Sequence, residues 1–163
     1  LATCKAIGDR VAESTASMGV ALTSCTIPAL GEPTFSIAED EMEMGVGIHG
    51  ERGIETMKLG TAKEITAIIC KKIEDDLKPQ KGQRILLHVN GLGATPPMEQ
   101  YLIFDEACQY WEERGVVIER SLVGDYTTAL DMAGISITVT LLDDELIALW
   151  DAPVHTANLR WGC

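Results

Sequence analysis

Gly45, Gly47 and His49 form the pattern in this sequence that is best suited to chemistry. Residues 42–50 alternate in type, and the alternation places these three on one face of a predicted strand. Glycine weakens the interior of a strand, so two glycines on one face indicate that something approaches the backbone closely. A neutral imidazole beside them can bind a metal, take a proton or add to an electrophilic carbonyl carbon.

The residues that follow His49 leave room for a small ligand. Gly50 and Gly53 carry no side chain, and Glu51 is the only carboxylate close enough in sequence to orient the imidazole ring. The alternative is a hydrogen-bonded, structural histidine at a strand end, with glycines that only form a tight turn. The spacing alone leaves both interpretations open.

Other polar residues carry weaker signals. His88 alternates with apolar residues, which is typical of a satisfied histidine within a sheet. Residues 90–93 (Asn-Gly-Leu-Gly) lie between a predicted strand and a predicted helix, where open α/β sheets bind ligands. Pro96 occupies the third glycine position of a dinucleotide motif, and no Gly-Lys-Ser/Thr element occurs, so the chain shows no phosphate loop. The polar residues Ser121, Thr127 and Thr128 are typical of caps and turns.

The elements that must position these residues alternate between helices and strands. Helical spacing predicts helices over 4–18, 65–77, 96–115, 126–132 and 145–150, the first of them ended by Gly19. Alternation of two predicts strands over 34–38, 42–50, 85–89, 116–122 and 135–141. We therefore expect an α/β fold with a mixed β-sheet of about five strands packed with helices, and a single domain over residues 1–163.

The composition excludes several classes of function. Thirteen Lys and Arg against 25 Asp and Glu give a net charge of −12, which argues against nucleic-acid or anionic-membrane binding. No apolar run is long enough to span a membrane. The five cysteines are scattered and odd in number, which favours a reducing, cytoplasmic setting and predicts no metal site. The sequence begins without Met and enters a helical pattern at once, so we expect a fragment of a longer protein.

Four ordered blocks of sequence resemble the dihydroxyacetone kinase family. They are residues 43–51 with their Gly-Ile-His-Gly-Glu motif, 89–96, 124–138 and the closing 149–153. The order and spacing resemble the carboxyl-terminal half of the substrate-binding (K) subunit, over nearly the whole chain. The resemblance implies the second subdomain of that fold, with the amino-terminal half absent from this sequence.

The resemblance also implies a mechanism. His49 would bind dihydroxyacetone covalently as a hemiaminal, with Gly45, Gly47, Gly50 and Glu51 supporting the substrate site. Glycerol has no carbonyl and would be rejected. The phosphoryl donor would be ATP, or a nucleotide-bearing subunit recharged by the phosphotransferase system of glycerol metabolism. The general base would come from the amino-terminal half, so the fragment alone would bind ketone without turnover.

The resemblance implies partners as well. ATP or ADP with Mg would lie on a separate helical domain or subunit, so no cofactor or metal is expected in this chain, and the family is usually a homodimer. The alternative function is a non-catalytic, ketone-binding paralogue that acts as a sensor or transcriptional co-activator. Arg52, Gln100, Ala129 and Ile135 depart from the family pattern. Because Arg52 adds charge beside the site, a larger ketose such as erythrulose remains open.

Overall fold

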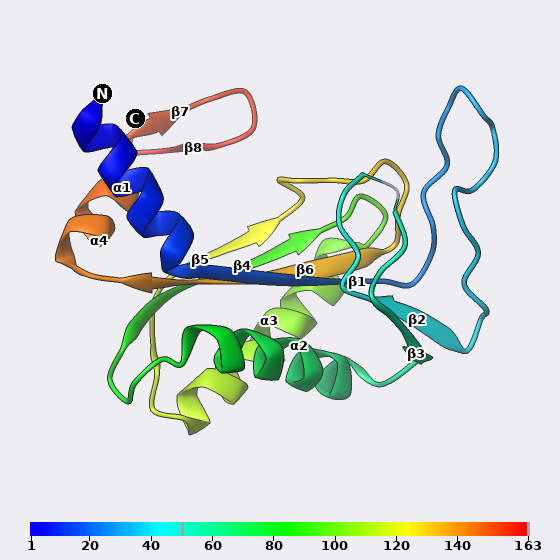
Figure 1. The fold of residues 1–163 in the computed structure, drawn as a ribbon, viewed down its shortest axis with the longest axis horizontal. Helices are drawn as coiled ribbons and strands as arrows, with labels where there is room; N and C mark the ends of the chain where they lie inside the picture. The colour runs from blue at the N-terminus through cyan, green and yellow to red at the C-terminus, as the bar shows by residue number, and fades with distance from the viewer. Residues whose placement is uncertain (50, 163) are drawn as a thin grey trace.

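The computed structural model describes residues 1–49 and 51–162, and Figure 1 shows the arrangement of their elements. The helices are α1 (Ala2–Glu13), α2 (Ala62–Leu77), α3 (Pro97–Glu113) and α4 (Asp144–Trp150). The strands are β1 (Thr15–Ala21), β2 (Glu41–Met44), β3 (Glu55–Lys58), β4 (Arg84–Gly91), β5 (Val117–Gly124), β6 (Gly134–Leu142), β7 (Val154–His155) and β8 (Arg160–Trp161).

Six of the strands form one mixed sheet in the order β3-β2-β1-β6-β4-β5. The β4–β5 pair is parallel, whereas β6 runs antiparallel to both of its neighbours, β1 and β4. The predicted mixed α/β sheet is confirmed, with six strands in place of about five. Two of the six, β1 and β3, were not predicted as strands, and β3 is a short and largely exposed strand that pairs with β2.

Helices α2 and α3 cover one face of the sheet, the lower face in Figure 1. The core between them and the sheet contains Ile69, Leu87 and Trp111, all fully enclosed. Thr61 and Glu64 fix the start of α2 through a capping box, in which the Thr61 side chain accepts from the Glu64 N–H and the Glu64 side chain accepts from the Thr61 N–H. The predicted helix over 65–77 is confirmed.

Removing the cap of α2 is expected to destabilise the fold modestly. Thr61→Ala leaves the Glu64 N–H without its acceptor, which costs about 1 kcal/mol of unfolding free energy. Urea denaturation measures the difference. Lys63→Ala, at an exposed position in the same helical turn, is the matched control and should stay within about 0.5 kcal/mol of wild type. Equal midpoints for the two variants would contradict the cap.

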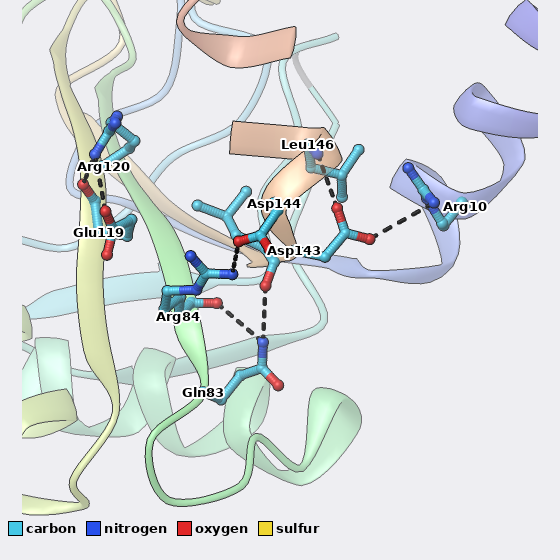
Figure 2. Close-up of polar contacts among 9 residues, drawn as sticks. Arg10, Gln83, Arg84, Glu119, Arg120, Asp143, Asp144 and Leu146 are labelled. Carbon is cyan, nitrogen blue, oxygen red and sulfur yellow. Dashed lines mark hydrogen bonds and ion pairs between the residues drawn. The ribbon is translucent and has the colours of Figure 1, made fainter. Parts of the chain in front are cut away.

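At one end of the opposite sheet face, α1 and α4 pack over Leu86 and Leu142, and Leu146 of α4 completes this apolar cluster. Figure 2 shows the polar contacts that surround this end. The Arg10 guanidinium pairs with Asp143, which is also the N-cap of α4, and with Glu145. Arg84 pairs with Asp144. The predicted short helix over 145–150 is confirmed, with Asp143 as its N-cap.

Besides the strand over 42–50, which ends early at Met44, three predicted elements are wrong. The first helix ends at Glu13, because Thr15–Ala21 pairs along its whole length with β6 as a strand. Residues 34–38 form no strand, since among the described residues their segment contributes only an isolated bridge between Thr26 and Pro33. Residues 126–132 form bends and a turn in place of a helix. In the first case long-range strand pairing overrides a local pattern. In the third, the segment is tied to the end of β4, where the Ala129 N–H donates to the Leu92 carbonyl.

Candidate functional site

A cavity of about 830 Å³ lies over the sheet and contains the predicted His49. Its lining combines β1, β4 and β6 with the loop that follows β2, and it extends to Lys72 and Asp76 of α2. The cavity reaches α2 past the edge of β1. That edge is uncovered by β2 along most of its length, because β2 pairs with β1 only at Val20 and Ala21 in the described chain. The residues that bring this site together are thus far apart in sequence.

The floor of the cavity consists of two rows of mostly polar residues on neighbouring strands. Strand register places Ser17, Thr138 and His88 in one row across β1, β6 and β4. Gly19, Ser136 and Asn90 form the next row. The hydroxyls of Ser17 and Thr138 are hydrogen bonded at 2.7 Å.

The predicted strand over 42–50 is wrong beyond Met44. Gly45 has φ +74°, a conformation that L side chains rarely adopt, and its N–H donates to the Gly19 carbonyl at 2.7 Å. The chain therefore leaves the sheet at Gly45 and crosses the end of β1, where a Cβ on Gly19 would lie 2.6 Å from the Val46 oxygen. His49 is consequently on a loop at the cavity, and not in a strand.

The predicted supporting residues lie around this loop. Gly45, Gly47, His49 and Glu51 all line the cavity, and His49 and Glu51 are exposed. A Cβ on Gly47 would lie 2.1 Å from Glu51 Oε1, so the carboxylate occupies the space that a side chain would need. No hydrogen bond joins Glu51 to His49 within the described chain. Gly50 lies outside the described residues.

Asn90 holds the loop that follows β5 against the cavity. Its Oδ1 accepts from the N–H groups of Tyr126 and Thr127 at 2.9 and 2.8 Å, and its Nδ2 donates to the Thr127 carbonyl at 2.8 Å. Asn90 is only 2% exposed, so these contacts satisfy a buried amide. The sequence indicated a ligand position at residues 90–93, and Asn90 and Leu92 do line the cavity. Thr127 lines it too, although it was expected only as a turn residue.

His88 differs from the satisfied sheet histidine that the sequence predicts. Its ring lines the cavity and packs edge-on against Tyr126, with 5.7 Å between the ring centroids. Its Nε2 is enclosed and has no hydrogen-bond partner in the described part of the chain. Burial lowers the pKa of the His88 imidazole below its usual value, which favours the neutral ring.

The lowered pKa of His88 predicts a pH-dependent stability. As pH falls below about 6.5, the unfolded chain takes up a proton at this position before the folded chain does. The His88 contribution to stability is therefore present above the unfolded pKa and declines toward the lower, folded pKa. We expect the unfolding free energy of wild type minus that of His88→Leu to fall between pH 7.5 and 5.5, by no more than about 1.4 kcal/mol per pH unit. Parallel denaturation profiles would contradict this.

Over residues 1–49 and 51–162, no group of three or more His, Cys, Asp and Glu side chains is arranged to hold a metal ion. In the same part of the chain, no helix combines the length and the apolar character needed to cross a membrane.

Comparison with known proteins identifies the family to which the fold belongs. The model of the Dak1 domain matches residues 1–158. The chain belongs to the Dak1 domain family. This Dak1 domain is 38% identical over 183 residues to the dihydroxyacetone-binding subunit DhaK of the PEP-dependent dihydroxyacetone kinase of Escherichia coli K12. The match covers 98% of this chain and 51% of the relative, so the Dak1 domain here spans about half of that subunit's length.

Solved structures agree with the Dak1 assignment. The dihydroxyacetone kinase of C. freundii, in complex with AMP-PNP and Mg²⁺, superposes with a TM-score of 0.81 at 29% identity, over 98% of this chain and 29% of that one. The dihydroxyacetone kinase operon co-activator Dha-DhaQ superposes with a TM-score of 0.86 at 28% identity, over 91% of this chain and 46% of that one. The Dak1 fold therefore occurs both in a kinase and in a co-activator.

Proposed function

We propose that this Dak1 domain is the carboxyl-terminal part of a dihydroxyacetone kinase K subunit, and that it holds the ketone as a hemiaminal on His49. The observation that carries the proposal is an exposed imidazole on a cavity loop with Gly45 and Gly47 beside it. A lone pair of the neutral ring adds to the carbonyl carbon as the C=O π bond breaks. The oxygen gains a proton while the second ring nitrogen loses one, so no group leaves.

This chemistry gives a physical basis for selectivity. A polyol such as glycerol fits the same space as dihydroxyacetone, but it has no electrophilic carbon for the ring nitrogen to attack. A pocket of this volume cannot discriminate between the two molecules by shape. Discrimination therefore rests on formation of the covalent bond. Glu51, folded against Gly47 beside the histidine, supports the loop that presents the imidazole.

The phosphoryl donor and the partners follow from the same proposal. ATP, or a nucleotide recharged by the phosphotransferase system, would lie with Mg²⁺ on a separate helical domain or subunit. The amino-terminal half of the K subunit would complete the substrate site, in a homodimer in the cytoplasm. The PEP-dependent relative supports the phosphotransferase route, and the AMP-PNP complex of the C. freundii kinase supports the ATP route.

A second candidate function is a ketone-binding co-activator of transcription. The superposition on the Dha-DhaQ co-activator gives it limited support, because it shows that this fold also occurs in a co-activator. The two functions share ketone binding and differ in phosphoryl transfer. An assay of phosphate transfer to dihydroxyacetone, with nucleotide-bearing subunits of both donor types supplied, therefore separates them.

The proposed capture is tested with dihydroxyacetone labelled with ¹³C at the carbonyl carbon. We expect a new tetrahedral-carbon signal when the labelled ketone is added to the protein, and no saturable binding of glycerol under the same conditions. A carbonyl signal that stays unchanged at saturating protein would contradict capture. Glycerol binding as tight as that of dihydroxyacetone would contradict selectivity by bond formation.

A further inference from the structure

His88 is a half-buried, polar residue on the cavity floor that hemiaminal capture at His49 does not use. Its Nε2 is enclosed without a partner in the described chain, and the ring lines the cavity, so Nδ1 is the nitrogen that remains accessible from the cavity. An unsatisfied polar ring on a sheet is costly, and an apolar residue would avoid the cost. A contact at Nδ1 would leave Nε2 unpartnered, but it would give the polar ring a role in ligand binding that an apolar residue cannot fill.

The neighbours of His88 indicate the kind of group that it contacts. In its row, Ser17 and Thr138 hydrogen bond to each other, and a hydroxyl pair retains lone pairs for a further contact. The row contains no charged side chain, and burial keeps the imidazole neutral. Such a surface suits the neutral hydroxyl group of a sugar better than a phosphate or a carboxylate.

The position of the row indicates which hydroxyl it would meet. The loop that carries His49 crosses β1 at Gly19, whose row contains Ser136 and Asn90. The His88 row lies two residues further along the strands, which corresponds to about 7 Å. The cavity, at about 830 Å³, is in the range of ~300–1,000 Å³ that accommodates ligands much larger than a three-carbon ketone.

We propose that His88 Nδ1, together with the Ser17–Thr138 hydroxyl pair, binds a hydroxyl group remote from the carbonyl of the captured ketone, and so favours ketoses longer than three carbons. This inference rests on the proposed function, because His49 must hold the carbonyl end. His88 is then a specificity-determining residue that contacts the substrate and leaves the covalent step to His49.

The test compares ketones of three and four carbons on the protein that carries this chain. Calorimetric affinities and the ¹³C tetrahedral signal are measured for dihydroxyacetone and erythrulose. We expect His88→Leu to weaken erythrulose binding about tenfold and dihydroxyacetone binding less than about twofold. His88→Gln retains hydrogen-bonding groups and should restore part of the difference. Thr138→Val should act in the same direction as His88→Leu. Thr140→Val, which breaks the equivalent Thr15–Thr140 pair outside the cavity lining, should change neither affinity.

Each other outcome overturns the inference. Equal losses for both ketones would show that His88 only supports the fold, and unchanged erythrulose affinity would show that it contacts nothing. If His88→Leu does not fold, the same ratio of affinities is measured on His88→Gln and Thr138→Val, and an unchanged ratio in both overturns the proposal. If wild type gives no tetrahedral signal, the proposed function itself is overturned. If wild type gives a normal signal that substitution of His88 does not change, only the inference about His88 is overturned.

Discussion

Replacing His49 by asparagine is expected to abolish covalent capture of dihydroxyacetone. Asparagine retains a polar side chain at the cavity but has no nitrogen lone pair able to add to a carbonyl carbon. The tetrahedral-carbon signal should disappear, and the affinity for the ketone should fall by about 100-fold or more, equivalent to ~2.8 kcal/mol. Because His49 is exposed, the substitution should leave the free energy of unfolding nearly unchanged.

The matched control for this experiment is His155→Asn. His155 is also exposed, but it lies in the β7–β8 hairpin and does not line the cavity. It should retain the full tetrahedral signal. A signal that persists in His49→Asn would move the covalent anchor to another nucleophile, and its loss in both variants would indicate a general effect of the substitutions.

Replacing Asn90 by leucine is expected to have the largest effect on the architecture of the cavity. The change leaves the N–H groups of Tyr126 and Thr127 without their acceptor and the Thr127 carbonyl without its donor. Unsatisfied groups of this kind cost about 1–3 kcal/mol each where water cannot replace the partner, and these are partly buried, so we expect a total loss of about 2–4 kcal/mol. Urea denaturation measures it.

Asn90→Asp separates the two halves of this contact. The carboxylate keeps oxygens for the two N–H groups but can no longer donate to Thr127, so we expect a smaller loss of stability than in Asn90→Leu. Limited proteolysis near residues 125–128 should follow the same order, with the leucine variant cleaved fastest. A loss below about 1 kcal/mol in Asn90→Leu would show that water readily replaces the side chain.

The sequence predicted those elements whose pattern is complete within the element itself. The helix over 65–77 has a capped start and ends before Pro79, and the strand over 135–141 has a strict alternation, so both are confirmed. The prediction of one helix over 4–18 was wrong, because the helical spacing continues into residues that pair with a strand about 120 positions away. Sequence spacing does not show which partner a segment will find.

The candidate site was predictable in composition but not in geometry. Gly45 stood out by type, whereas its positive φ depends on the Gly19 carbonyl and on Ile54, which packs where a Cβ would lie. His88 was expected to be satisfied, because alternation shows that two residues share a sheet face and does not show what covers that face. The enclosed Nε2 depends on that cover, which includes Tyr126, and only the three-dimensional arrangement reveals it.

The pairing of β1 with β6 determines when the site can form during synthesis. Thr15 opposes Thr140, so β1 cannot form its pairing with β6 before β6 has been synthesised. The intervening chain must then be closed into a loop of about 125 residues. Non-local pairing of this kind slows folding. Until Leu142 has left the ribosome, β1 has no central partner and the row of Ser17, Thr138 and His88 does not exist, so the proposed ketone site is incomplete on a nascent chain that lacks β6.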